Sequence, residues 1–367
     1  MKAFDKQTIS AGQLAILYVS FMVGSSIVYI PNPLIQFAGN MAWLSLIASA
    51  LMGMLLLSLV LYLFRCYPDD IYTVYLERVY GRWIAGVFAV LLMLMLHLMF
   101  AYIVLGVGNF FINTMMLETP MYMFNALTIV VASYTVRAGI DAMGRMFFLP
   151  LCIMMLAVLM ILIFTIPIAK WEMLLPLFPE GFKPVLHGTY FSLGFPFAEL
   201  FLFAVILPIV RKESRRRAGI WMQWMTAFSG LVLLVVTVLT VVSLGPLADA
   251  RKFSLYAVAR MFKIGNVMVG LEAIVGIAMM VGSFMKAAIV LFILNCVTAR
   301  FFGLNDDKLL PAIAFIGFLL SMTMIHTESE FVFSVDIVWP ILVLALGIIP
   351  LVLAALITFV KRRPGRG

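Results

Sequence analysis

Charged side chains are scarce in this chain of 367 residues. Only 11% of the residues are Asp, Glu, Lys or Arg, whereas 65% are hydrophobic, and the apolar excess recurs along the whole length. A soluble protein of this size needs roughly a quarter of its residues charged to cover its surface. The scarcity excludes a soluble domain and indicates an integral membrane protein, whose apolar side chains a bilayer solvates directly.

Residues that bind metals and perform catalysis are also few. The three cysteines, Cys66, Cys152 and Cys296, are too widely separated for a disulfide framework or a zinc site. Phosphate-loop and nucleophile motifs are absent, so we expect no enzyme, cofactor or metal. The net charge of +8 comes from short basic clusters without a continuous patch. Nucleic acid is therefore not an expected partner.

Ten apolar runs are long enough to cross a hydrocarbon core of about 30 Å. Together they predict a single transmembrane domain over residues 1–367, made of two halves with five spans each. The first repeat covers about 8–166 and the second about 188–360. The predicted spans are 11–37, 41–64, 83–112, 121–137, 146–166, 188–210, 218–244, 266–299, 309–326 and 336–360.

The distribution of Lys and Arg predicts the orientation in the membrane. Basic residues near the ends of spans are retained in the cytoplasm. Eighteen of them lie in the termini and in the gaps on the same side as the termini, against six in the opposite gaps. Both termini are therefore predicted to be cytoplasmic. The stretches 68–82 and 254–263 mix apolar and charged residues, which predicts helices lying in the membrane interface.

Two of the predicted spans contain helix-breaking residues at about half their depth. Gly24 is followed by two serines in the first span, and Pro196 precedes Glu199 in the sixth. Unsatisfied backbone persists at that depth only where it lines a protein or water cavity. Breaks at equivalent positions of two five-span halves are typical of inverted-repeat transporters of the LeuT-like fold. The alternative is that Gly24 is a packing glycine and Pro196 an ordinary kink. The predicted substrate-binding residues are Gly24, Ser25, Ser26, Gly194, Phe195, Phe197, Ala198 and Glu199.

Ionisable residues inside the predicted spans are functional candidates, because a charge near the bilayer centre costs at least about 2.5 kcal/mol. Glu199 is a candidate to hold a substrate amine, to carry a coupling proton, or to cap freed backbone amides. Lys286, fourteen residues after Glu272, lies on the same face of the eighth span. The rise separates the two by about 21 Å, so they cannot pair.

Lys286 itself has three open readings: it occupies the place of a coupling cation, pairs with another carboxylate, or extends its amine towards the cytoplasm. A histidine at mid-depth of the third span is a candidate for proton relay or for an interhelical hydrogen bond. The residues predicted to act in coupling or gating are Lys286, Ser283, His97 and Glu272.

Four stretches together resemble the spore germination permease family, the B-type subunits of germinant receptors in endospore-forming bacteria. This family belongs to the amino acid/polyamine/organocation superfamily. The stretches are 9–14 (ISAGQL) leading to Gly24 and Pro31, 134–140 (YTVRAGI), 194–199 (GFPFAE), and 271–273 (LEA) leading to 282–286 (GSFMK). The resemblance covers nearly the whole chain.

The resemblance implies a ten-span, transporter-like subunit in the spore inner membrane that senses a small germinant, often an amino acid. It also implies partners, namely the A-type and C-type receptor subunits, besides membrane lipid. Two other functions stay open from the residues alone. One is a proton- or cation-coupled amino acid symporter, and the other is a channel subunit.

Overall fold

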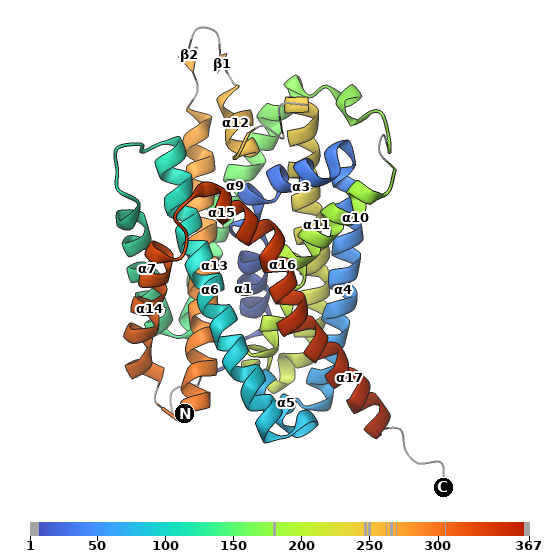
Figure 1. Cartoon of the computed structure of the whole chain (residues 1–367), viewed down its shortest axis with the longest axis vertical. Helices are drawn as coiled ribbons and strands as arrows, with labels where there is room; N and C mark the ends of the chain where they lie inside the picture. The colour runs from blue at the N-terminus through green and yellow to red at the C-terminus, as the bar shows by residue number, and fades with distance from the viewer. Residues whose placement is uncertain are drawn as a thin grey trace.

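The chain folds almost entirely into helices, most of which run along the long axis of the molecule (Figure 1). The computed structural model describes residues 7–178, 181–245, 248, 251–261, 263–264, 267–268, 270–304 and 306–362. Within these residues, seven helical segments are long and apolar enough to cross a membrane, and Lys308–Thr323 is a shorter apolar helix. The chain is therefore a multi-pass membrane protein. The seven segments are Ala11–Tyr29, Pro31–Cys66, Arg82–Thr114, Ile140–Ile168, Lys212–Leu244, Leu271–Phe302 and Glu328–Lys361.

The first half of the chain forms nine α-helices within the described residues. Short 3-10 turns follow α3 and α9, at Gly39–Met41, Ile166–Ile168 and Trp171–Leu174. The helices are α1 (Ala11–Val23), α2 (Ser26–Tyr29), α3 (Pro31–Ala38), α4 (Ala42–Cys66), α5 (Tyr72–Tyr80), α6 (Arg82–Thr114), α7 (Met121–Ala138), α8 (Ile140–Met146) and α9 (Phe148–Thr165).

The second half is less regular. Its sixth-span segment begins with α10 (Lys183–Ser192) and continues through a π-helical turn, η5 (Leu193–Phe197), into the 3-10 turns η6 (Glu199–Ala204) and η7 (Leu207–Ile209). A further 3-10 turn, Lys212–Ser214, precedes α11. The remaining elements are α11 (Arg215–Leu244), α12 (Ser254–Arg260), β1 (Lys263–Ile264), β2 (Val267–Met268), α13 (Leu271–Phe302), α14 (Asp306–Thr323), α15 (Glu328–Phe333), η10 (Ser334–Val338), α16 (Trp339–Leu342), η11 (Val343–Ile348) and α17 (Ile349–Arg362).

Two ends of the molecule can be distinguished in Figure 1. The short helix α5 and the end of α17 lie at one end, which we call the α5 face. The short helix α12 and the antiparallel β1–β2 hairpin lie at the other end, which we call the α12 face. The short helices α5 and α12 fall within the two stretches that the sequence predicts to be interfacial.

The structure changes three predicted span boundaries. The first span does not run to residue 37: α2 ends at Tyr29, and α3 lies across the α12 end of the bundle (Figure 1). Pro31 causes this bend, because it cannot donate a backbone hydrogen bond and its ring crowds the preceding turn. The eighth span begins at Leu271 rather than residue 266, since the β1–β2 hairpin occupies the residues before it.

The tenth span begins eight residues before its predicted start at 336. Thr327 caps α15 through a capping box with Glu330, so the helical run starts at Glu328. Hydropathy alone places the boundary too late because this first turn is acidic. The predicted spans 121–137 and 188–210 correspond to α7 and to the α10–η7 segment, which are not among the seven apolar segments. The ten-span count therefore stays a prediction.

Burial differs sharply between the spans. In an apolar 18-residue stretch of each segment, 83% of the residues are buried in Ala11–Tyr29 and 78% in Leu271–Phe302, but only 28% in Ile140–Ile168. The contacts of α13 with α1, α6, α7 and α9 put it at the centre of the bundle. The helix with the Gly24 break and the helix with Lys286 thus form the enclosed core.

Candidate functional site

The first break is built on a contact between two glycines. A capping box between Ser10 and Gln13 starts α1, which ends at Val23, and the backbone of Gly24 (φ −10°, ψ −110°) leaves the helical path before α2 begins. A Cβ on Gly24 would lie 2.7 Å from the carbonyl oxygen of Ser20 and 2.9 Å from that of Gly282 in α13. Gly24 is therefore a packing glycine and also the point at which the helix changes course.

The second break turns the sixth-span segment at Phe195. That residue has extended backbone angles (φ −141°, ψ 110°) between α10 and η6. The amide of Ala198 donates a hydrogen bond of 2.6 Å to the carbonyl of Leu193, which closes a wide turn. Gly194 packs so closely against Pro340 that a Cβ at position 194 would overlap the ring of that proline. The break leads directly into Glu199, whose side chain is buried.

Glu199 and Lys286 form an ion pair in the protein interior. The Lys286 Nζ lies 2.7 Å from Oε2 of Glu199, and the two side chains are 0% and 1% exposed. The indole Nε1 of Trp339 donates a 2.7 Å hydrogen bond to Oε1. The ammonium also lies 4.3 Å from the ring centre of Phe195 and 4.9 Å from that of Phe21. Each carboxylate oxygen of Glu199 thus has a partner, as a buried ion pair requires.

This pairing excludes one reading of Lys286 and agrees with another, whereas its place as a coupling cation stays a prediction. The amine does not extend to the cytoplasm, because it is fully buried and bonded to Glu199. Its partner is a carboxylate 87 residues away in the sequence. Glu199 is not available to a ligand amine while this pair is intact, so the proposal that it holds a substrate amine requires the pair to open.

A cavity beside this pair, which we call the inner chamber, has a volume of about 40 Å³. A buried water needs about 10–15 Å³, so this conformation has room for about three waters. A ligand as large as an amino acid requires the walls to move apart. The lining residues come from both breaks, α6, α13 and the tenth span: Ser25, Tyr29, Met99, Tyr102, Ile103, Phe195, Glu199, Lys286, Phe331, Val335 and Trp339.

The structure brings only part of the predicted binding set to this chamber. Ser25, Phe195 and Glu199 line it, together with Lys286 from the coupling set. The side chain of Phe197 packs instead on Gly53, in α4. The other predicted binding residues lie beside the chamber without lining it: Gly24, Ser26, Gly194 and Ala198.

The remaining coupling candidates lie apart from the inner chamber. Among the described residues, the hydroxyl of Ser283 donates a hydrogen bond of 3.6 Å to the sulfur of Met279 in its own helix. His97 Nδ1 lies 2.8 Å from the carbonyl oxygen of Met93, also in its own helix. The described residues give its buried Nε2 no partner, so they form no interhelical hydrogen bond with His97 in this conformation, and its role in coupling stays a prediction. Glu272 lies in the first turn of α13, distant along the helix from Lys286.

A second cavity, the outer chamber, lies beside the inner one and has a volume of about 30 Å³. The two chambers share four wall residues, Tyr29, Phe195, Phe331 and Val335, which separate them. Three of the four are aromatic. The other residues of the outer chamber are Asn32, Pro33, Phe191, Lys252, Val332 and Asp336.

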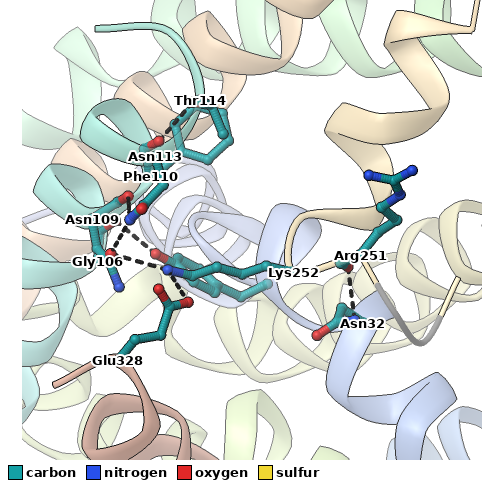
Figure 2. Close-up of polar contacts among 10 residues, drawn as sticks. Asn32, Gly106, Asn109, Phe110, Asn113, Thr114, Arg251, Lys252 and Glu328 are labelled. Atoms are coloured by element: carbon teal, nitrogen blue, oxygen red, sulfur yellow. Dashed lines mark hydrogen bonds and ion pairs between the residues drawn. The ribbon is translucent and has the colours of Figure 1, made fainter. Parts of the chain in front are cut away.

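Lys252 lines the outer chamber, and its polar contacts are drawn in Figure 2. Its ammonium forms an ion pair with Glu328 and donates a 3.0 Å hydrogen bond to Oδ1 of Asn109 in α6. It also lies 5.1 Å from the ring centre of Phe253. The amide of Asn32 donates a 2.8 Å hydrogen bond to the carbonyl of Arg251, joining α3 to this loop (Figure 2). Burial lowers the pKa of Lys252, and the Glu328 carboxylate opposes that shift.

Sequence reasoning missed Asp336, which is 6% exposed and lines the outer chamber. The predicted tenth span begins at that residue, which placed its carboxylate at the membrane surface. The capping box at Thr327 and Glu330 is the signal that would have moved the boundary and exposed the error. Trp339 and the tyrosines of the inner chamber carry no comparable signal, because aromatic residues are common throughout the spans.

The four stretches that carry the family resemblance meet in two pairs. At the start of α1, the side-chain amide of Gln13 donates a 2.8 Å hydrogen bond to Oδ1 of Asp141, which directly follows the second stretch. Arg145 pairs with the same carboxylate at 2.7 Å. The third and fourth stretches meet in the Glu199–Lys286 pair. The four stretches that carry the family resemblance are therefore also in contact with one another, in two pairs, in the folded protein.

Solved structures with a similar backbone show the fold class. MhsT in complex with L-phenylalanine has a TM-score of 0.69 at 13% identity, over 97% of this chain and 99% of that chain. Mhp1, a nucleobase-cation-symport-1 family transporter with bromovinylhydantoin bound, has a TM-score of 0.72 at 12% identity, over 98% and 80%. A Na⁺-coupled sialic acid symporter has a TM-score of 0.68 at 10% identity, over 94% and 79%. The chain is thus an all-helical membrane protein with a LeuT-like transporter fold.

The family follows from the sequence comparisons. A family model described as spore germination protein matches residues 8–331, so the chain belongs to that family. Spore germination protein KB of Bacillus subtilis (strain 168) is 27% identical over 333 residues, which cover 89% of this chain and 87% of that protein. Spore germination protein YndE of the same organism is 20% identical over 238 residues, 62% of this chain and 63% of that protein. The predicted family is confirmed.

Proposed function

We propose that this protein is the B-type subunit of a germinant receptor and binds a small germinant, an amino acid, in the inner chamber. The observation that carries the proposal is a cavity between the two breaks of a transporter-like fold, with mostly apolar walls and the Glu199–Lys286 ion pair at its side. Family membership supports the role in germination. MhsT, of the same fold, is described in complex with L-phenylalanine, which supports an amino acid as the class of ligand.

A zwitterionic ligand offers one charged group to each member of the buried pair. Its carboxylate is attracted to Lys286 and its ammonium to Glu199, while Ser25 offers a hydroxyl beside the first break. Binding then exchanges one direct ion pair for two ligand contacts and separates η6 from α13. Since α13 is the central helix of the bundle, this separation is the conformational change that we expect the receptor to transmit.

Glu199→Gln tests this role because it removes the charge at nearly constant volume and keeps an acceptor for Trp339. We expect binding of the responsive amino acid to weaken by about tenfold or more, as for the loss of a charge-assisted hydrogen bond. Binding is measured by equilibrium dialysis of labelled amino acids against the protein in nanodiscs. Unchanged affinity in a variant that elutes and melts like the wild type would refute the site role of Glu199.

A proton- or cation-coupled amino acid symporter is the second candidate function, favoured by the fold shared with a Na⁺-coupled symporter. Uptake of labelled amino acids into proteoliposomes, with and without a proton or Na⁺ gradient, separates the two. Concentrative uptake that depends on the gradient would show that the protein is a transporter and not only a receptor. Ligand-gated single-channel current would instead support a channel subunit.

We also propose ten spans in a 5+5 inverted repeat, with both termini in the cytoplasm and the α12 face outside the spore inner membrane. The positive-inside distribution of Lys and Arg supports this orientation. The A-type and C-type subunits are the proposed partners, and no enzymatic activity is proposed. Accessibility of cysteines introduced singly at the two faces tests the topology, and co-purification of the three subunits from spore membranes tests the partnership.

A further inference from the structure

Glu199 and Asp336 are the two acidic side chains buried within the described part of the chain. Their surroundings are opposite. Glu199 has a partner on each carboxylate oxygen, whereas Asp336, only 6% exposed, has no hydrogen-bond or ion-pair partner among those residues. An ionised carboxylate buried without a partner is strongly unfavourable. Asp336 is therefore either neutralised by a proton or paired with a cationic group that enters the outer chamber.

Lys252 supplies the opposite charge in the same chamber. Its partner Glu328 has a side chain that is 48% exposed. Ion pairs with such exposed partners contribute only about 0–1 kcal/mol, so an incoming carboxylate can replace Glu328 at little cost. Asn109 keeps the ammonium in place during the exchange, because it accepts a hydrogen bond from Nζ at 3.0 Å.

The rest of the outer chamber selects for a small molecule with an apolar part. Phe191, Phe195, Phe331 and Pro33 form its apolar walls. A bare inorganic cation would meet the positive charge of Lys252 in the same small space, and a bare anion would meet Asp336. A molecule with both charges satisfies both side chains and carries no net charge into the chamber.

We propose that the outer chamber is a second binding site, for a small zwitterionic amino acid whose ammonium pairs with Asp336 and whose carboxylate pairs with Lys252. The site lies on the α12 side of the shared wall formed by Tyr29, Phe195, Phe331 and Val335. Its volume of about 30 Å³ is smaller than an amino acid, so the outer chamber, like the inner one, must widen when the ligand enters. The choice of an amino acid rests on the proposed function, whereas the two charged contacts rest on the outer chamber itself. The chain then holds two ligand molecules at saturation, one on each side of that wall.

The test is the number of ligand molecules bound per chain. Tritiated L-alanine, L-valine and L-phenylalanine are dialysed to saturation against the full-length protein in nanodiscs. We expect two molecules of the responsive amino acid per chain for the wild type and one for Asp336→Asn, with the affinity of the remaining site changed by less than about twofold. Lys252→Met is expected to lose the same bound molecule as Asp336→Asn. Asp336→Glu, which keeps the carboxylate, is expected to retain it.

A ligand without the ammonium sharpens the assignment. We expect the labelled amino acid in the outer chamber, which Asp336→Asn does not bind, to stay bound in an excess of an unlabelled acid that lacks the amine. The acids are propionate, 3-methylbutanoate and 3-phenylpropanoate. Displacement of that labelled amino acid would overturn the proposal. Asp69→Asn is the matched control, since it removes an exposed carboxylate that pairs with Arg215 far from both chambers, and two molecules should remain bound.

The outcomes separate this proposal from the proposed function. One molecule per chain in the wild type, unchanged in a folded Asp336→Asn, overturns the outer site and leaves the inner one standing. One molecule that is lost in Asp336→Asn but kept in Glu199→Gln supports the outer site and removes the inner one. No binding of any of the three amino acids overturns both. Elution volume and melting temperature identify variants that fail to fold, and Asp336→Glu then carries the test.

Discussion

The inner and outer chambers share a wall, but their charged side chains differ in the hydrogen-bond and ion-pair partners that surround them. In the inner chamber, Glu199 is bonded to Lys286 and Trp339, and both members of the ion pair are fully enclosed. In the outer chamber, Lys252 is paired with a half-exposed Glu328, and Asp336 has no partner among the described residues. The fully paired Glu199 and Lys286 hold their helices together, whereas the carboxylate of Asp336, unpartnered within the described part of the chain, is available to a ligand.

The comparison shows that depth in a membrane protein does not by itself identify the group that binds a ligand. Both acids are buried, but the sequence drew attention only to Glu199, which follows a proline break. Yet the availability of a carboxylate depends on which donors surround it. Three variants test how far the two chambers differ.

The largest expected effect is on the closed pair. Lys286→Met leaves the Glu199 carboxylate buried without its cation, which is expected to lower the free energy of unfolding by about 3–5 kcal/mol. The double variant Lys286→Met with Glu199→Leu should recover most of that loss, because no buried charge remains. Thermal or denaturant unfolding in detergent measures both.

Lys308→Met is the matched control for that variant, because Lys308 is exposed at the start of α14. Its unfolding free energy should stay within about 0.5 kcal/mol of the wild type. A loss of less than about 1 kcal/mol in Lys286→Met would show that the pair does not hold the inner chamber closed.

An intermediate effect is expected at the glycine contact behind the inner chamber. A Cβ at Gly24 meets two backbone carbonyl oxygens at less than 3 Å, so Gly24→Ala must push α1 and α13 apart. Forced overpacking of this kind costs about 1–3 kcal/mol. Gly86→Ala is the control, since nothing lies within 4 Å of a Cβ there and alanine favours the helix. Equal melting temperatures of the two variants would contradict the close contact.

The smallest effect is expected in the outer chamber and depends on pH. Because burial lowers the pKa of Lys252 from 10.5, the unfolded chain binds more protons than the folded chain between the lowered pKa and 10.5. Stability contributed by this group therefore rises with pH across that window. Lys252→Met should remove this part of the pH dependence, and a melting curve series in alkaline buffers measures it. If the melting temperature depends on pH equally in the variant and the wild type, the ammonium of Lys252 is solvated and its pKa is not lowered by burial.

Most of the fold could be predicted because it depends on local pattern. The apolar runs predicted α4, α6, α7 and α11 to within about four residues. The predicted span boundaries were wrong where a local feature other than hydropathy sets the end of the helix. Pro31 ended the first span early, the β1–β2 hairpin delayed α13, and the capping box at Thr327 started the tenth span at Glu328.

The candidate site was predictable only in part. Ser25, Phe195, Glu199 and Lys286 line the inner chamber, and each was marked by a break or by a charge in an apolar run. Asp336 was overlooked through a boundary error. Trp339 and Tyr29 were invisible, since an aromatic residue in a membrane span most often packs against neighbours or faces lipid.

The sequence by itself determined that this is a multi-pass membrane protein of the spore germination family and where its helices weaken, because composition, periodicity and motif order are properties of neighbouring residues. Only the tertiary structure decided which charges meet. Glu199 and Lys286 are 87 residues apart, and Asp336 lies beyond both. Their partners depend on the rotation and packing of separate helices, which set one carboxylate in a closed pair and left the other facing a cavity.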